Sequence, residues 1–319
     1  MKAKGTKKIG VLAGGTSSER EISLESGKAV YKALKDAGFN VLFLDIRDDA
    51  ERILKTSKIN VAFIALHGRF GEDGTVQAIL EKLSIPYTGS DPRSSRLAMD
   101  KILSKKLFIK HKLPVPDYIT LDEKQVLPTQ MHKQLGMPLV FKPHNEGSSI
   151  GLSVVRRKTD IAKALKLALQ YSNKIIVEKF IKGREVTVGI FDDKPLPVIE
   201  ILPEHGLYDY SAKYIDKKTS YEIPAKIDKK SYDRAQRLAT SAHNACGCKD
   251  FSRVDMRMSE SGNLYVLEVN TIPGLTERSL LPKAARAAGI DFKQLCIRLV
   301  NRALDRKGER HGRIKKEKR

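Results

Sequence analysis

Tryptophan is absent from this chain, and only 6% of its 319 residues are aromatic. Proteins that bind single-stranded nucleic acid stack bases on aromatic side chains, so this scarcity argues against that class. The three cysteines, Cys246, Cys248 and Cys296, do not make a disulfide framework, and the first two lie too close together for a zinc finger. This cysteine usage is typical of a cytoplasmic protein, and we expect that location.

Long apolar segments are also lacking, and no stretch approaches the length of a transmembrane helix. Residues 1–8 are basic, but the apolar run at 9–13 is too short for the core of a signal peptide. We therefore expect no membrane span. What is present, 41% hydrophobic and 30% charged residues, suits a soluble globular protein of two or three domains.

Acidic residues are scarce relative to basic ones, 38 against 59, and the formal net charge is +21. The basic excess is spread along the chain and is densest at 306–319. One interpretation is attraction to nucleic acid, an anionic membrane or nucleotides. We prefer a solvated basic tail, because no recognition motif accompanies the charge. We thus expect no nucleic-acid partner, and weak contact of the tail with polyanions stays an alternative.

The first part of the chain alternates strand and helix patterns, which predicts a parallel α/β domain. Apolar runs predict strands at 8–13, 41–44 and 61–66, and a helix at 19–37. The Gly14-Gly15 turn lacks the spacing of a dinucleotide-binding motif. Polar residues follow two of the strands, Glu19 after the first and His67, in a glycine-rich turn, after the third. Open α/β sheets bind ligands at such strand ends, so both residues are candidates, although a lone loop histidine is usually just solvated.

A helix is predicted at 94–111, and it carries Lys101. Its inward residues are expected to be Leu97, Leu103, Leu107 and Phe108. A strand at 139–143 follows and contains Lys142 between apolar residues. The small-residue loop at 146–151 can lay backbone N–H groups over phosphates, or it is an ordinary Gly-Ser hairpin. The nearby Lys142 favours the phosphate interpretation.

Two more strands, at 174–181 and 185–191, flank Gly183 and carry Glu178 and Glu185 among apolar residues. Buried carboxylates need partners, which a ribose and an adenine amine or, alternatively, Lys179 or Arg184 can supply. Residues 207–221 form a long loop rich in tyrosine and lysine, a composition and length that predict a lid, although base stacking on nucleic acid is an alternative. Three residues are expected to cap helices at their N-termini, namely Thr159, Asp228 and Asp291.

The segment 253–270 predicts a hairpin that turns at Ser261 and Gly262. This turn places Asp255 opposite Glu268 and Arg253 opposite Asn270, so all four side chains lie on one face. The opposite face is expected to hold the core residues Val254, Met256, Met258, Tyr265, Leu267 and Val269. Clustered carboxylate and amide oxygens suit Mg²⁺, although two surface ion pairs are the simpler alternative.

Five sequence blocks occur together, and they resemble the D-alanine–D-alanine ligase family of the ATP-grasp superfamily over about residues 9–290. They read GGTSSEREISLESG, HGRFGEDGTVQAILEKLSIPYTGS with LAMDK, FKPHNEGSSIG, YDYSAKY with TSYEIPA, and RVDM with LEVNTIPGLTERSLLP. The resemblance implies an α/β (α+β) ATP-grasp fold with three domains: 1–97 binds the first substrate, 98–181 is the central lid domain, and 182–319 contains the metal site, the lid loop and the basic tail. The nucleotide lies between the central and C-terminal domains.

The resemblance also implies a reaction, in which ATP phosphorylates one D-alanine and the amine of a second displaces the phosphate, for peptidoglycan precursor synthesis. In this family pattern Asp255, Glu268 and Asn270 hold Mg²⁺ or Mn²⁺, with two ions expected. Lys101 and Lys142 contact the phosphates. The ATP-binding loop includes Glu146, Gly147 and Ser149, and adenine and ribose are held by Glu178, Glu185 and the backbone near Lys179 and Phe180.

For the amino-acid substrates, the resemblance assigns Glu19 to the first ammonium group and His67 to the first carboxylate. Arg253 and the Gly274 N–H form an oxyanion hole. Ser279, Leu280 and Lys213 bind the second carboxylate, and Tyr214 reaches Glu19 and Ser148. A homodimer is implied, and a ligase for a different amino acid is the alternative function. The chain departs from the pattern at Lys249-Asp250, where a glycine is commoner, and at Arg96, which replaces a small residue.

Overall fold

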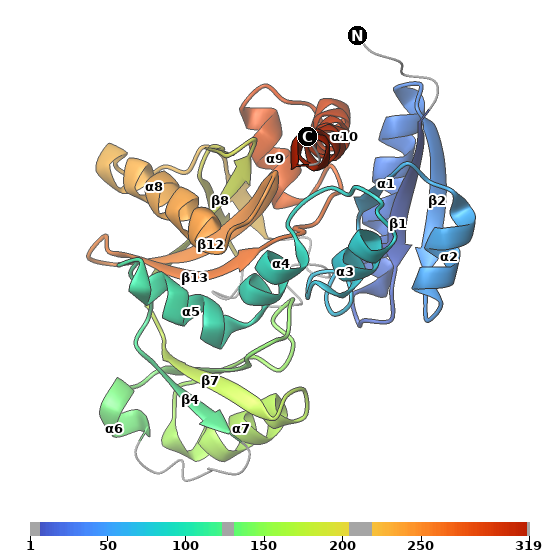
Figure 1. Ribbon diagram of the computed structural model, residues 1–319. Helices are drawn as coiled ribbons and strands as arrows, with labels where there is room; N and C mark the ends of the chain where they lie inside the picture. Colours follow the sequence, from blue (N-terminus) through green and yellow to red (C-terminus); the bar gives the residue numbers. More distant parts are fainter. Residues whose placement is uncertain (1–6, 123–130, 204–218, 318–319) are drawn as a thin grey trace.

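Three β-sheets organise the computed structural model, which describes residues 7–122, 131–203 and 219–317, with side chains described as far as residue 306 (Figure 1). None of the helices in these ranges combines the length and the hydrophobicity that a membrane crossing requires. The mixed α/β architecture agrees with the predicted fold class.

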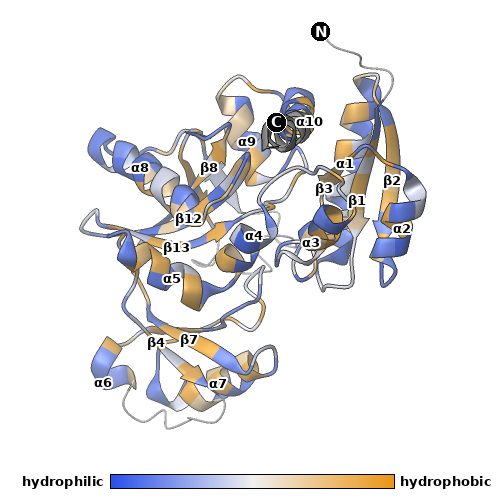
Figure 2. Cartoon of the chain, in the orientation of Figure 1, coloured by the Kyte–Doolittle hydropathy of each residue, from blue (hydrophilic) through white to orange (hydrophobic). Residues whose placement is uncertain are grey.

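The first sheet is parallel, as predicted, with the order β2 (Asn40–Ile46), β1 (Lys8–Gly14), β3 (Val61–Ile64). Because side chains alternate along a strand, Ile9 and Val11 pack on the side of α1 (Arg20–Asp36), while Leu12 packs on the other side. There it meets α2 (Ala50–Ser57), which the sequence analysis did not predict, and α3 (Thr75–Lys82). In Figure 2 the strands of this sheet are largely hydrophobic, whereas α2 is mostly hydrophilic. Both faces of the sheet are therefore covered.

The single helix predicted at 94–111 is wrong, because the chain breaks at Asp100 into α4 (Pro92–Met99) and α5 (Lys101–Lys110). Asp100 has an extended ψ of 103°, and its carboxylate accepts hydrogen bonds from Ile102 N and Leu103 N at 2.9 and 3.0 Å. An aspartate that caps two free N–H groups starts a new helix. The break rotates the second half, so Leu103 is 45% exposed and not inward as expected. Arg96 is exposed and needs no small residue at its position.

The second sheet is antiparallel, with the order β4 (Tyr118–Asp122), β7 (Lys174–Lys179), β5 (Leu139–Pro143), β6 (Ser153–Val155). Helices α6 (Met131–Leu135) and α7 (Ile161–Leu169) cover one face of it. A 3-10 turn, Lys158–Asp160, precedes α7, so its N-cap is Asp160 and the predicted cap Thr159 is wrong. The uncovered face carries Val140, Lys142 and Glu178, and it faces the third sheet across a pocket.

The third sheet has the order β11 (Ser220–Glu222), β10 (Ile199–Leu202), β8 (Gly183–Phe191), β12 (Phe251–Ser259), β13 (Leu264–Asn270), and β9 (Lys194–Pro195) pairs with β8. Helix α8 (Lys229–Ala245) packs on one face, and α9 (Leu280–Ala287) packs on β8 from the other. Asp228 caps α8 as predicted, since it accepts a hydrogen bond from Ser231 N at 2.9 Å. The helices leave the end of the β12–β13 hairpin open toward the pocket.

The hairpin confirms the predicted pairs Asp255–Glu268 and Arg253–Asn270, but a bulge follows between Asp255 and Met256. Because a one-residue slip moves side chains to the other face, the core face of β13 differs from the prediction. Leu264 and Val266 are fully buried in the core, whereas the expected core residues Tyr265 and Leu267 are only partly buried. The turn also includes Glu260, so it is one residue longer than the expected Ser261-Gly262 turn, and the bulge restores the predicted register at the open end.

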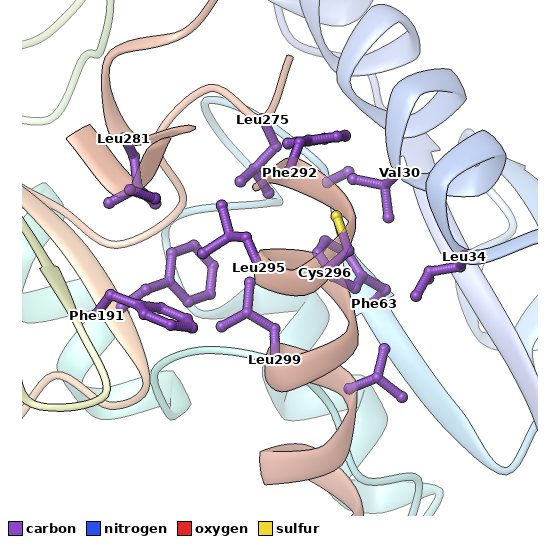
Figure 3. Close-up of a cluster of buried hydrophobic side chains, with 14 of the residues drawn as sticks. Val30, Leu34, Phe63, Phe191, Leu275, Leu281, Phe292, Leu295, Cys296 and Leu299 are labelled. Carbon is purple, nitrogen blue, oxygen red and sulfur yellow. The ribbon is translucent and has the colours of Figure 1, made fainter. Parts of the chain in front are cut away.

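The last helix, α10 (Phe292–Glu317), begins after Asp291, whose carboxylate accepts from Gln294 N at 2.7 Å as predicted. Its buried side chains, among them Leu295, Cys296 and Leu299, pack between Val30 of α1 and Phe191 of β8 (Figure 3). One continuous core therefore joins the first and third sheets and holds the site between them.

Candidate active site

Two pockets meet at the open end of the hairpin. The first lies between the second and third sheets, and its polar lining includes Lys101, Lys142, Glu146, Ser149, Glu178, Lys179, Glu185, Asp255, Arg257 and Glu268. The second lies between the first and third sheets, and its polar lining includes Glu19, His67, Ser148, Arg253, Glu268, Asn270, Thr276, Arg278 and Ser279. Glu268 lines both, and the loop at 146–151 contributes to both. The structure thus brings most of the predicted site residues together as two adjoining pockets.

Cations line the inner end of the first pocket. Lys101, at the start of α5, places Nζ 3.1 Å from Glu268 Oε2 and donates to the Glu146 carbonyl at 2.6 Å. Lys142, on β5, places Nζ 2.9 Å from Glu178 Oε1. Both lysines are 7% exposed. Two nearly buried ammonium groups, each beside a carboxylate, can exchange those partners for the oxygens of a polyphosphate.

The same pocket has apolar walls, including Val140, Ile150, Val154 and Leu267, and Glu178, which Lys142 contacts, is buried there. Burial alone would raise the pKa of Glu178, but Lys105 and Lys142 hold it below its ordinary value. Burial lowers the pKa of Lys105 to about 8, although Glu178 acts in the opposite direction. An ionised carboxylate set among apolar walls can accept a hydrogen bond from the amine of a flat base. The partners of Glu178 are Lys105 and Lys142, not Lys179, which the sequence analysis gave as an alternative.

At the outer edge Glu185 pairs with Arg257 Nη1 at 3.0 Å, and Arg184 pairs with Glu200 instead of Glu185. Arg257 also donates to the Ile181 and Gly183 carbonyls at 3.1 and 3.0 Å. Its guanidinium lies 5.2 Å from the centre of the Phe180 ring. This arrangement holds the strand connection in place, so the Glu185 carboxylate faces the pocket on a rigid support.

The backbone N–H groups of Lys179 and Phe180 already form hydrogen bonds within the protein. Lys179 N donates to the Asp117 carbonyl at 2.9 Å, and Phe180 N donates to the Pro138 carbonyl at 3.0 Å. Ile181, which the sequence analysis did not select, lines the pocket beside them.

The small-residue loop folds as a turn over the junction of the two pockets. Ser148 and Ser149 both adopt left-handed conformations, with φ of 48° and 60°. Such turns point successive N–H groups to one side and favour anions. Arg69 forms an ion pair with Glu146 and donates to the Tyr171 carbonyl at 3.0 Å, which ties this loop to the loop that follows β3.

The hairpin end holds its carboxylates in a network of donors. Asp255 is 7% exposed and accepts from Arg253 Nε and Nη2 at 2.8 and 2.7 Å. It also accepts from Thr187 Oγ1 at 2.6 Å and from Asn270 Nδ2 at 3.0 Å. Within the described ranges no group of three or more His, Cys, Asp and Glu side chains gathers as a metal site. The predicted set here is two carboxylates and one amide, whose oxygens suit a hard divalent cation.

Glu19 and His67 stand at the inner wall of the second pocket, 5% and 3% exposed. Glu19 is the N-cap of α1, but its side chain makes no capping bond; its carboxylate accepts a hydrogen bond from the Ser148 hydroxyl. Gly68 and Gly147 flank it so closely that a Cβ at either would lie 2.8 or 2.9 Å from Glu19 Oε2. These glycines let two loops close over one carboxylate.

His67 is held on both ring nitrogens. Its Nδ1 donates to the Ile272 carbonyl at 3.1 Å, and Nε2 lies 2.9 Å from Ser26 Oγ. Burial alone would lower the pKa of His67, but Glu72, whose carboxylate lies 3.4 Å from Nδ1, raises it above its ordinary value. A protonated imidazole here supplies positive charge at the wall of the pocket.

The opposite wall comes from the loop before α9. Gly274, Ser279 and Leu280 all line the pocket, and Ser279 is the N-cap of α9. A helix N-terminus favours an anion. The predicted Lys213 and Tyr214 lie outside the described residues, as does most of the predicted lid loop.

Sequence reasoning missed several residues of this site, notably Lys105, Arg257 and Glu72. Arg257 follows Asp255 by two residues, so strand alternation alone places it on the site face and could have found it. Lys105 follows Lys101 by four residues, and both lie within the predicted helix at 94–111, so helical spacing could have placed Lys105 on the same face. For Glu72 no local pattern was available, because it meets His67 only through the fold of the irregular turn between them.

Comparisons with known proteins agree with this geometry. A family model described as "D-ala D-ala ligase C-terminus" matches residues 107–301, and one described as "D-ala D-ala ligase N-terminus" matches residues 8–57 and 47–90. A D-alanine–D-alanine ligase from Geotalea uraniireducens (strain Rf4) is 46% identical over 297 residues, which cover 92% of this chain and 95% of that protein.

Two solved structures are similar along almost their whole length. The D-alanine–D-alanine ligase from Bacillus anthracis complexed with ATP is 34% identical with a TM-score of 0.83, covering 95% of this chain and 99% of that one. The VanG D-Ala:D-Ser ligase from Enterococcus faecalis is 32% identical with a TM-score of 0.81, covering 93% and 99%.

Proposed function

The chain belongs to the D-alanine–D-alanine ligase family, and we propose that it joins two D-alanine molecules in an ATP-dependent reaction that forms D-alanyl-D-alanine, ADP and phosphate. One observation carries the proposal: a pocket suited to a nucleotide and a pocket suited to amino acids share Glu268 and the loop at 146–151. A γ-phosphate in the first pocket would therefore lie beside a carboxylate in the second. The product serves as a precursor for peptidoglycan synthesis.

The reaction has two chemical steps. A carboxylate oxygen of the first D-alanine attacks the γ-phosphorus of ATP, ADP leaves, and an acylphosphate forms. The neutral amine of the second D-alanine then attacks the acyl carbon, the bond to phosphate breaks, and the amide remains after loss of a proton. Both steps depend on positioning and on neutralisation of charge, which Lys101 and Lys142 supply in the nucleotide pocket.

In the nucleotide pocket we assign the base and ribose to Glu178 and Glu185, with backbone contacts at Lys179 and Phe180. The loop that contains Glu146, Gly147 and Ser149 closes over the phosphates. The apolar walls and the ATP complex of the Bacillus anthracis relative support this assignment.

We assign a Mg²⁺ or Mn²⁺ site, with two ions expected, to Asp255, Glu268 and Asn270. Carboxylate and amide oxygens gather here, and these are the ligands that a hard divalent cation prefers. Arg253 and Lys101 now neutralise the two carboxylates, and a bound cation would take over that role. Bound ions would neutralise charge on the β- and γ-phosphates. Arg253 lines the amino-acid pocket as well, and we assign its guanidinium, together with the Gly274 N–H, to a developing oxyanion.

In the amino-acid pocket Glu19 is assigned to the ammonium group of the first D-alanine, and His67 to its carboxylate. Ser279, the Leu280 backbone and Lys213 are assigned to the carboxylate of the second D-alanine at the start of α9. Tyr214 is assigned to the contact with Glu19 and Ser148. The buried carboxylate of Glu19 opposite a helix N-terminus supports a zwitterionic substrate.

We also infer three domains with boundaries near 97 and 181, since each of these segments contains one of the three sheets. A homodimer is proposed from the family resemblance, and size-exclusion chromatography with light scattering would test it. The cytoplasm is proposed as the location because the reaction consumes ATP.

Release of phosphate from ATP tests the function directly. With Mg²⁺ present, D-alanine should stimulate release, and mass spectrometry should identify D-alanyl-D-alanine. Failure of D-alanine to stimulate release would refute the proposal. A panel with L-alanine, D-lactate and D-serine tests the alternative of a different acceptor; the likeness to a D-Ala:D-Ser ligase makes D-serine the informative comparison.

A further inference from the structure

A lysine that no motif singled out lies behind the nucleotide pocket. Lys105 has no exposed surface, and its Nζ lies 3.2 Å from Glu178 Oε1. Glu178 is 2% exposed, and the same oxygen is 2.9 Å from Lys142 Nζ. One carboxylate oxygen thus faces two ammonium groups where water is excluded.

Helix α5 supplies a cation to each end of the pocket. Lys101 and Lys105 are four residues apart, so they lie on one face of the helix. Lys101 reaches Glu268 at the end we assign to phosphate, and Lys105 reaches Glu178 one helical turn further along. Lys105 does not line the pocket itself, so it acts on a ligand only through Glu178.

The contact is an ion pair without complete hydrogen bonds. Among the described residues, neither Lys105 Nζ nor Glu178 Oε1 has a hydrogen bond of good geometry. The centre of the Tyr118 ring lies 5.9 Å from Lys105 Nζ. Burying an ion pair with incomplete hydrogen bonds costs stability, and apolar residues in place of both partners are often neutral or stabilising. A charge kept at this disadvantage beside a ligand pocket indicates a role in binding.

We propose that Lys105 is a positioning residue that keeps Glu178 ionised and available to the exocyclic amine of adenine, so that the site selects ATP over GTP. The inference rests on the proposed function, because it takes this pocket to bind ATP. Phosphate groups draw Lys142 from Glu178 when a nucleotide binds, and Lys105 then remains as its counter-ion. An ionised carboxylate accepts a hydrogen bond from the adenine amine, whereas the O6 of guanine presents only lone pairs to it.

Calorimetric affinities for ADP and GDP in the presence of Mg²⁺ test this proposal. Lys105→Met removes the charge and keeps an unbranched side chain, and Lys106→Met is the matched control because Lys106 is exposed. We expect Lys105→Met to weaken ADP binding about tenfold or more and to change GDP binding by less than about twofold, since one partner of a buried ion pair is lost. Lys106→Met should keep the wild-type affinities.

These measurements need no amino acid, so they separate this inference from ligation of D-alanine, which phosphate release measures independently. In turnover assays KM for ATP should rise in Lys105→Met while kcat stays within about twofold. In the Glu178→Gln background Lys105→Met should change the ADP-to-GDP ratio by less than about twofold, because the two residues act as a unit. Lys105→Gln provides a second uncharged variant and replaces Lys105→Met if the methionine variant does not fold.

Two results would overturn the inference. Unchanged ADP affinity in the uncharged variants would show that Lys105 does not act on the base. Equal weakening of ADP and GDP would show a structural role only.

Discussion

Asp250 links three parts of the molecule and provides a sharp test of the packing between the first and third sheets. It is 2% exposed and accepts hydrogen bonds from Gly89 N at 2.8 Å, Arg302 Nε at 3.2 Å and Arg306 Nη2 at 2.9 Å. Its φ is +64°, a conformation that favours glycine. This explains the departure from the family pattern, because aspartate tolerates the backbone of the commoner glycine and adds a carboxylate that binds two arginines.

The expected loss for Asp250→Ala follows from these contacts. The two arginine side chains are 36% and 29% exposed and keep other partners, so we reduce the usual value for charge-assisted bonds, about 1.5 to 3 kcal/mol, to about 1 to 1.5 kcal/mol each, and take about 1 kcal/mol for the orphaned Gly89 N–H. The total is about 3 to 4 kcal/mol. Asp250→Gly loses the same bonds but removes the left-handed backbone penalty, so it should be about 1 kcal/mol more stable than Asp250→Ala.

Thermal and urea denaturation followed by circular dichroism measure both differences. With about 2.1 cal/mol/K of unfolding entropy per residue over this chain, Asp250→Ala should lower Tm by roughly 5 °C, and Asp250→Gly by about 1.5 °C less. Asp233→Ala is the control, because it removes only the exposed ion pair with Lys229 and should change stability by less than about 1 kcal/mol. Wild-type stability in Asp250→Ala, or a glycine variant less stable than the alanine variant, would refute this reasoning.

Three further predictions concern the site. Asp255→Asn should abolish Mg²⁺-dependent phosphate release while the protein stays folded by circular dichroism, and retained activity at ordinary Mg²⁺ concentrations would contradict the metal assignment. Arg253→Lys keeps one charge but loses the two-pronged contact to Asp255, so kcat should fall about 100-fold or more with KM for ATP little changed; a change in KM alone would exclude the oxyanion role. The folded-state pKa of Lys105, about 8, is below its ordinary 10.5. Burial of the charged ammonium therefore lowers the free energy of unfolding by its full amount below pH 8, and this loss disappears as pH rises to 10.5 and the folded protein releases the proton. Wild type should therefore gain unfolding free energy relative to Lys105→Met, by roughly 2–3 kcal/mol across that range, and a difference that is flat with pH would contradict it.

The order of polar residues along the chain was sufficient to predict which of them gather at the candidate site. Glu19 and His67 follow parallel strands, and parallel strands end at one edge of a sheet, so their proximity follows from topology. Asp255 and Glu268 pair across a hairpin, where a short turn and alternation set which side chains meet. Both inferences need only local geometry and a count of residues.

Other features depended on contacts that no local pattern contains. The break at Asp100 was missed because two local preferences conflict there. Helix propensity favours one continuous helix, whereas the capping aspartate favours the start of a second one. The bulge after Asp255 shifted the core face of β13, since one inserted residue outweighs the alternation on which the prediction relied.

The sequence by itself determined the fold class, the family and the chemical types at the site, because these depend on periodicity, motif order and residue identity. Only the tertiary structure decided which charges pair: Glu178 with Lys105 and Lys142, Glu185 with Arg257, and Asp250 with two arginines of the last helix. Each of these pairs joins different elements of the fold. Ion pairing depends on distance and burial, and those are set by how the sheets and helices pack, so the sequence supplied the charges and the packing supplied their partners.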